Sequence, residues 1–195
     1  MSTFDGDAER TYLARVLAEL TAIRRARLLS MLVLAAAMLV AGLGAAFQAQ
    51  GERTDAVLLF SAFSLIMIGI VCAIGAIIAW TRLGRDPLDS VAARRPATTR
   101  APRTPGGGMA IAIGFAVVGL LLGFLLWAQT PILAVAVVLA CLLLACLGPI
   151  WARELSSADD RFALILASDD ELATRFETFT PIWLHDAVES ERRED

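Results

Sequence analysis

The side chains in this sequence that could take part in chemistry are few, and they lie far from one another along the chain. His185 is the single histidine, next to Asp186 and downstream of three consecutive acids at 169–171. An imidazole beside carboxylates can act as an acid–base group or as a metal ligand, but helical metal sites repeat their ligands at fixed spacings such as His-x-x-x-His. Because the sequence has no such repeat, we interpret these residues as the solvated acidic face of a helix, with a metal or acid–base site as the alternative.

The three cysteines form no catalytic or metal-binding pattern either. Cys141 and Cys146 are five residues apart, which places them on different faces of a helix, and Cys72 lies elsewhere in the chain. We expect free thiols in apolar segments, with acylation of Cys146 as the alternative. Gly106–Gly108 is not a phosphate loop, because no strand precedes it and no Lys-Ser/Thr pair follows it. The sequence therefore predicts no catalytic residue, cofactor, metal or identifiable small-molecule substrate, and we expect a protein that is not an enzyme.

Four long apolar blocks carry most of the hydrophobic character of the sequence. Of the 195 residues, 57% are hydrophobic, above the ~45–50% of soluble domains, and the mean hydropathy is +0.67. Each block contains the roughly 20 residues that a helix needs to cross a bilayer, and none contains Asp, Glu, Arg or His. The blocks are residues 28–48, 56–80, 109–127 and 131–151. We therefore predict an all-α integral membrane four-helix bundle made of two transmembrane hairpins, 28–80 and 109–151.

The distribution of arginine predicts the orientation of these spans. All 17 basic residues are arginines: the arm 1–27 carries five and the connection 81–108 six, whereas the connection 49–55 carries one and 128–130 none. Because arginine-rich connections stay in the cytoplasm, both termini are expected inside a bacterial inner (cytoplasmic) membrane, the arginine-only composition being typical of a GC-rich genome. The alternative is that the first span is a cleaved signal peptide, but its apolar run is longer than the ~7–15 residues of such a peptide.

The arm 1–27 has the periodicity of an amphipathic helix that continues into the first span without a break. Its apolar stripe consists of Leu13, Val16, Leu17, Leu20 and Ile23. Three interpretations stay open: a helix lying on the membrane surface, a helix that binds a partner protein, and a helix packed on the chain's own tail. Arg24, Arg25 and Arg27 favour the first, because an arginine beside anionic lipid headgroups gains about 1 kcal/mol.

The connection 81–108 has the composition of a flexible linker. It contains four prolines and the triplet Gly106–Gly108, it shows no apolar periodicity, and its net charge is +4, from six arginines against two aspartates. Such a segment buries too little apolar surface to offset its conformational entropy. We therefore predict a basic, Pro/Gly-rich cytoplasmic linker that stays unfolded.

The segment 152–195 is predicted to be an acidic cytoplasmic tail made of short helices. Its net charge is −7, from twelve acidic residues against five arginines, which should attract it to the +4 connection. Residues 168–171 have the form of a capping box with Ser168 as the N-cap; a shorter helix precedes it at 161–167, and Thr180–Pro181 restarts a helix after it. The residues predicted to dock the tail are Leu172, Phe176, Phe179 and Trp183, with Ile182, Leu184 and Val188 on the apolar side of the last helix.

The spans contain small residues at helical spacing and very few polar ones. The candidate helix-packing residues are Ala37, Ala41 and Ala45 in the first span and Gly119 and Gly123 in the third. We expect them to pack the four helices of one chain together, with dimerisation of two chains as the alternative. Because coupled carriers usually keep ionisable residues inside the membrane, their absence from these spans argues against a hydrophilic pathway through one chain.

These features together favour a multi-pass membrane protein of non-enzymatic accessory or interaction type. Its expected partners are the lipid bilayer and either a protein partner or a second copy of itself, and the net charge of −3 gives no indication of nucleic-acid binding. The arm and the acidic tail would then be anchored at the membrane for a cytoplasmic protein or complex. The alternative is a small homo-oligomeric transporter or channel whose path lies between protomers.

Overall fold

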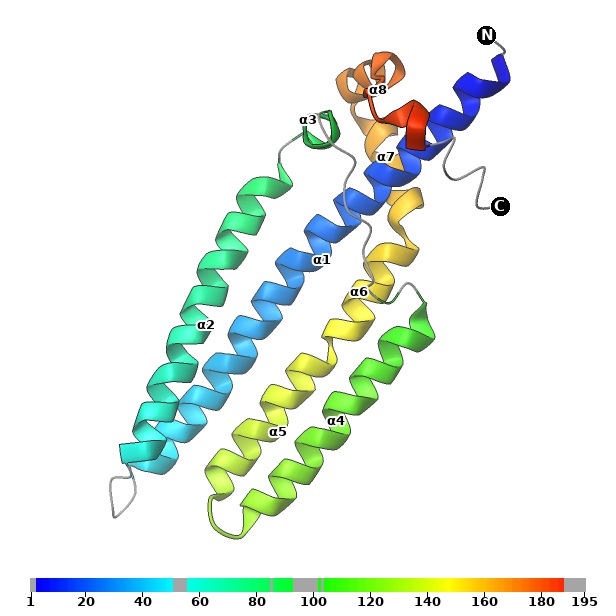
Figure 1. Cartoon of the computed structure of the whole chain (residues 1–195). Coiled ribbons are helices and arrows are strands. Elements are labelled where there is room, and N and C mark those ends of the chain that lie inside the picture. The colour runs from blue at the N-terminus through cyan, green and yellow to red at the C-terminus, as the bar shows by residue number, and fades with distance from the viewer. Residues whose placement is uncertain (1–2, 51–55, 85, 93–101, 103, 188–195) are drawn as a thin grey trace. The chain divides into compact units, whose positions relative to one another are not determined.

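All regular structure in the described part of the chain is helical (Figure 1). The computed structural model describes residues 3–50, 56–84, 86–92, 102 and 104–187. The helices are α1 (Thr3–Ala49), α2 (Ala56–Leu83), α3 (Pro87–Val91), α4 (Pro105–Trp127), α5 (Pro131–Ala145), α6 (Leu147–Ser156), α7 (Ala158–Ser168) and α8 (Asp170–Thr178). The predicted all-α class is therefore confirmed.

Four helical stretches are long and apolar enough to cross a membrane. They cover Ala8–Ala49, Ala56–Leu83, Pro105–Trp127 and Pro131–Ser156, the last of which combines α5 and α6. A segment in hydrocarbon must satisfy its own backbone hydrogen bonds, and a continuous helix does so. Each of the four predicted apolar blocks falls within one of these stretches, which agrees with a multi-pass membrane protein.

The chain divides into two compact units, which we describe separately. The apolar unit comprises Ala26–Thr81 and Ala101–Arg153, and the three-segment unit comprises Met1–Arg25, Arg82–Arg100 and Glu154–Asp195. Helix α1 contributes residues to both, because it is a single helix of 47 residues that contains no proline. The prediction that the arm continues into the first apolar stretch is confirmed.

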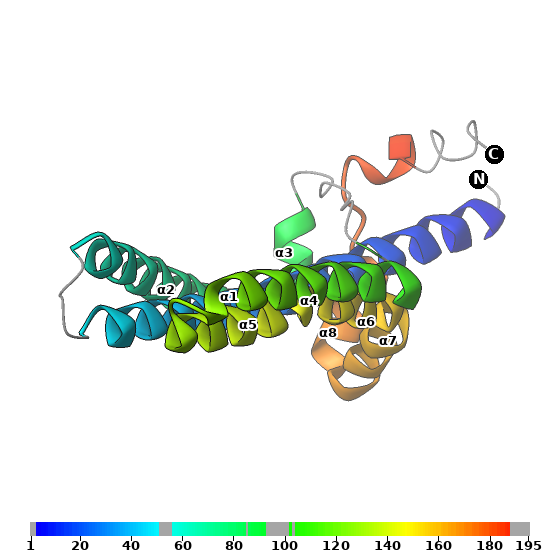
Figure 2. The ribbon, with the colours of Figure 1, turned by 90° about the horizontal axis from the view of Figure 1, so that it is seen from below.

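In the apolar unit, two glycines bring α4 and α5 close together. A Cβ atom added at Gly119 of α4 would lie 2.5 Å from the Cβ of Cys141 in α5, and one added at Gly123 would overlap the side chain of Val138. Figures 1 and 2 show the two helices side by side from both directions. Both candidate packing glycines of α4 therefore contact a neighbouring helix of the same chain.

Helix α1 contacts α2 and α5 within the same unit. A Cβ atom added at Gly42 would lie 2.8 Å from the Cγ1 of Ile66 in α2, and one added at Gly44 would overlap Ala136 of α5. The candidate packing residues of α1 lie along this stretch, with Ala37 and Ala45 buried and Ala41 half-buried. Close approach of the backbones at small residues is the usual way in which apolar helices pack in a membrane.

A break divides the last apolar stretch near its end. Helix α5 ends at Ala145 and α6 begins at Leu147. Pro149 accounts for the break, because a proline cannot donate a hydrogen bond to the carbonyl four residues earlier, that of Ala145, and its ring crowds that carbonyl. Beyond the break, the indole Nε1 of Trp151 donates a hydrogen bond of 2.8 Å to the hydroxyl of Ser30 in α1. This bond fixes α6 to α1 inside the apolar unit.

Part of the connection 81–108 is folded, which corrects the prediction of an unfolded linker. Asp86 caps α3 by accepting a hydrogen bond of 2.8 Å from the Leu88 N–H, and Pro87 occupies the first turn. Leu88 and Val91 are among the most buried side chains of the described residues. A five-residue helix is too short to show apolar periodicity, so the composition of the connection gave no indication of it.

The tail contains the predicted succession of short helices, but its N-cap differs from the prediction. Ser168 is the last residue of α7, which is longer than the predicted 161–167, and Asp169 caps α8 by accepting a hydrogen bond of 3.0 Å from the Leu172 N–H. Serine and aspartate are both good N-caps, and the cap moves one residue along because Ser168 keeps its place in α7. The chain becomes helical again after Pro181, as predicted.

Candidate functional site

The described residues of the three-segment unit share one hydrophobic core. Its buried members are Leu13, Leu17, Ala18 and Ala22 from α1, Leu88 and Val91 from α3, and Ala158, Phe162, Leu172 and Leu184 from the tail. Burial of apolar surface is the main term that stabilises folded chains, at about 25 cal/mol per Å². The arm, the connection and the tail therefore stabilise one another.

The apolar stripe of the arm packs on the chain's own tail, which is the third of the interpretations given above. Leu13 and Leu17 are fully buried in the shared core, and Leu20 is half-buried against it. A stripe covered in this way cannot at the same time lie in a lipid surface or bind a separate partner through the same residues. The exposed part of the unit is what remains for contacts with other molecules.

The arginines predicted to lie at lipid headgroups have different surroundings. Arg24 donates a hydrogen bond to the hydroxyl of Ser90 in α3. Arg25 is half-buried and Arg27 is exposed. One of the three thus takes part in holding α3 to the arm.

The four residues predicted to dock the tail lie in or against the shared core. Leu172 is buried, and Phe176, Phe179 and Trp183 are half-buried and packed on it. The indole Nε1 of Trp183 donates a hydrogen bond of 2.6 Å to the carbonyl of Val91 in α3. Ile182, predicted on the same apolar side, is 96% exposed, and Val188 lies outside the described residues.

Phe162, an apolar residue of the predicted helix 161–167 that was not among the four residues predicted to dock the tail, is central to the core. Its side chain is 3% exposed, and its ring meets that of Phe176 edge-on, with the ring centroids 6.1 Å apart. The signal was present as an apolar residue at helical spacing from Ala158 and Ile165. Close by in sequence, the carboxylate of Glu154 is buried and ion-paired with Arg161.

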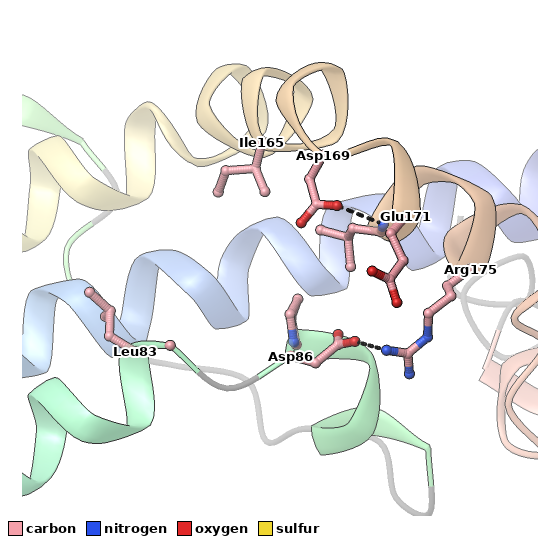
Figure 3. A pocket seen from close by; sticks show the side chains of 9 residues that line it. Leu83, Asp86, Ile165, Asp169, Glu171 and Arg175 are labelled. Atoms are coloured by element: carbon pink, nitrogen blue, oxygen red, sulfur yellow. Dashed lines mark hydrogen bonds and ion pairs between the residues drawn. The ribbon is translucent and has the colours of Figure 1, made fainter.

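A cavity of about 350 Å³ lies within the three-segment unit, between the end of α2, α3 and the α7–α8 junction (Figure 3). Its lining residues are Leu83, Gly84, Asp86, Pro87, Ile165, Asp169, Glu171, Leu172 and Arg175. The volume is near the lower end of the range for small-ligand sites, ~300–1,000 Å³. Apolar and charged side chains both contribute to its walls.

Arg175 links the two sides of this cavity. Its guanidinium is ion-paired with Asp86 and lies 3.1 Å from a carboxylate oxygen of Asp89, so α8 is tied to α3. The signs of these charges are the reverse of the expected attraction, because here the tail supplies the arginine and the connection supplies the acids. Exposed pairs of this kind contribute only about 0–1 kcal/mol each.

His185 is not among the residues that line this cavity, and a carboxylate of α1 lies close to it. Its Nδ1 is 3.1 Å from a carboxylate oxygen of Glu9 in α1, and its side chain is 70% exposed. Over the residues that the structure describes, no three side chains of His, Cys, Asp or Glu are grouped so as to hold a metal ion. The cysteines are free thiols, with Cys72 and Cys141 half-buried and Cys146 exposed.

Comparison of the chain with protein-family models, with curated proteins and with solved structures finds no match.

Proposed function

We propose that this chain is a non-enzymatic accessory protein of the bacterial inner membrane, which holds a helical interaction unit for a protein partner in the cytoplasm. The four apolar stretches would form two transmembrane hairpins with both termini inside. The segments before the first stretch, between the second and third, and after the fourth are rich in arginine, whereas the connection within each hairpin is not. Arginine-rich segments stay in the cytoplasm. The three-segment unit would then face the cytoplasm.

The observation that carries this proposal is the shared core of the three-segment unit. Three segments that are separated in sequence by apolar stretches bury their large side chains together. Chain ends and a linker that served only to connect spans would not need a common core. Ordering these three segments costs conformational entropy, and the fixed surface that results is suited to recognising another protein.

The exposed side chains of the unit support a protein partner. Most of the tail's apolar residues are used inside the core, but Leu164 of α7 is 69% exposed and Ile182 is 96% exposed. Acidic side chains surround them in sequence, at 159–160, 169–171 and 186, and the described ones are exposed. An exposed apolar residue within a charged surface is a common composition for a protein contact.

Site-specific photo-crosslinking in intact cells tests the proposal. A photoreactive phenylalanine analogue would replace Ile182, and the matched control would carry it at Phe124 of α4, which is 82% exposed in the apolar unit. We expect Ile182 to give a discrete adduct with a different polypeptide, identified by mass spectrometry, and Phe124 to give lipid adducts alone. Adducts between copies of this chain from Phe124, with none from Ile182, would instead support the homo-oligomeric transporter.

A further inference from the structure

Three of the described arginines have no hydrogen-bond or ion-pair partner among the residues that the structure describes. They are Arg25 and Arg27 of α1 and Arg82 of α2. Two arginines of the tail are different, because Arg161 and Arg175 are both paired with carboxylates of the chain. The three unpaired guanidiniums therefore have their full hydrogen-bonding capacity left for a molecule other than this chain.

All three arginines lie where an apolar block ends. Arg27 directly precedes the block 28–48, and Arg82 follows the block 56–80 by two residues. Because a helix rises about 1.5 Å per residue, the Cα atoms of all three lie within about 5 Å of these blocks along the helices that carry them. Arg27 and Arg82 are exposed, and Arg25 is half-buried. When the blocks span a bilayer, this position is the depth of the lipid headgroups.

An exposed tryptophan gives independent support for this depth in α2. The side chain of Trp80 is 67% exposed and lies two residues before Arg82. Tryptophan is enriched at the membrane–water interface, because its ring is amphipathic. The aromatic ring and the guanidinium thus both match the boundary between hydrocarbon and headgroups.

The charge of the surrounding sequence selects the sign of the headgroup. Residues 20–30 contain three arginines and no acid, and the connection 81–108 has a net charge of +4 over its whole length. The two acids of that connection, Asp86 and Asp89, are both ion-paired with Arg175. Guanidiniums in such surroundings attract an anionic headgroup and gain nothing from the cationic amine of a zwitterionic one.

We propose that Arg25, Arg27 and Arg82 bind the phosphate groups of anionic phospholipids. A planar guanidinium can donate two parallel hydrogen bonds to the oxygens of one phosphate. Arg24, which the sequence placed with this group, instead donates a hydrogen bond to Ser90 in α3. The proposal requires the apolar stretches to span a bilayer, but it requires neither the orientation nor the protein partner of the proposed function.

The test uses the full chain in nanodiscs that contain equal amounts of phosphatidylglycerol and phosphatidylcholine with the same acyl chains. Native mass spectrometry of the released protein counts the lipids that stay bound. We expect phosphatidylglycerol to exceed phosphatidylcholine about 5-fold among singly bound lipids. Changing Arg25, Arg27 and Arg82 together to glutamine should bring the two lipids close to equal retention. Changing the same three to lysine, which keeps the charge, should preserve the excess of phosphatidylglycerol.

The matched control for a single change, Arg27→Gln, is Arg10→Gln, which removes the same charge from the same helix. Arg10 is exposed and lies 17 residues before Arg27 (27 − 10), which is about 25 Å along α1. This distance exceeds the Debye length of about 8 Å at physiological ionic strength, so only Arg27→Gln should lower the excess. An equal loss in Arg10→Gln would overturn the proposal. Equal retention of the two lipids by the unmodified chain would also overturn it and leave these arginines to a protein partner.

Competition distinguishes a lipid from a soluble anion. Glycerol phosphate carries a phosphate without acyl chains, and we expect it to lower the excess of phosphatidylglycerol no more than sodium chloride does at the same ionic strength. Specific displacement would assign the arginines to a soluble phosphate and overturn the proposal. The Ile182 crosslink tests the proposed function separately, so either proposal can fail while the other stands.

Discussion

Among the large apolar side chains of the tail, Phe162 is almost fully buried and Ile182 almost fully exposed, at 3% and 96% exposed. Removing a fully buried phenylalanine costs about 3–5 kcal/mol, because the packing around it relaxes only in part. Changes at an exposed position stay within about 0.5 kcal/mol. We therefore expect Phe162→Ala to unfold much of the three-segment unit and Ile182→Ala to leave it intact.

Hydrogen exchange of the amides of residues 170–187, with the full chain in detergent, measures this difference. Faster exchange throughout this range in Phe162→Ala, and unchanged exchange in Ile182→Ala, is the expected result. Free exchange of these amides in the unmodified chain would show that the tail is not docked, and the shared core would then be the wrong description.

At the residue scale, the sequence predicts the core best where apolar residues repeat over several turns. Leu172 and Phe176 were found because they lie one helical turn apart. Leu88 and Val91 were not, because five residues in a proline-containing connection show no repeat. The cavity could not be predicted from the sequence either, since Asp86 and Glu171 come from segments whose contact the sequence does not indicate.

At the scale of the elements, the backbones of α4 and α6 approach each other closely near the starts of the two helices. A Cβ atom added at Gly108 would lie 2.7 Å from the carbonyl oxygen of Gly148, and one added at Gly148 would overlap the carbonyl oxygen of Gly108. The obstacle is backbone in each case, so the helices themselves must separate. We expect Gly148→Ala to destabilise this unit by about 1–3 kcal/mol, as overpacking does.

Thermal unfolding of the full chain in detergent measures this effect, with Gly114→Ala as the matched control. A Cβ atom at Gly114 of α4 meets nothing within 4 Å, and alanine is the better helix former, so this variant should be as stable as the unmodified chain. Equal unfolding temperatures for the two variants would contradict the close approach of α4 and α6.

The positions of the four long apolar stretches could be predicted from hydropathy, because the thickness of a bilayer sets the number of apolar residues that a spanning helix needs. The break between α5 and α6 is local and belongs to Pro149. The N-cap of α8 was misplaced by one residue because Ser168 and Asp169 are both suitable, and only the extent of α7 decides between them.

At the scale of the whole molecule, the proposed orientation makes a direct prediction about access from outside the cell. In a chain whose cysteines are replaced, Ala128→Cys, between α4 and α5, should react with a membrane-impermeant maleimide in intact cells. Ser168→Cys should react only after permeabilisation, because positive residues keep its side of the chain in the cytoplasm. Labelling of Ser168→Cys in intact cells would reverse or refute the four-span arrangement.

The convergence of three segments on one core could not have been derived from the sequence. Its contacts join residues separated by tens to more than a hundred positions, such as Leu17, Leu88 and Leu172. Periodicity reports the face that a helix buries but not the partner that covers it. For this reason the arm left three interpretations open, and the packing of the described residues decided among them.

The same core also sets an order in time for each newly made chain. The arm residues up to Ala22 leave the ribosome first, and Leu172 follows 150 residues later (172 − 22). At a synthesis rate of about 5–20 residues per second, the apolar stripe of the arm stays uncovered by the tail for about 8–30 s. During that interval the apolar stripe is exposed, and it stays exposed in a product whose synthesis stops before the tail. We expect chaperones and proteases to act on such products first, because the tail residues that cover the arm are missing from them.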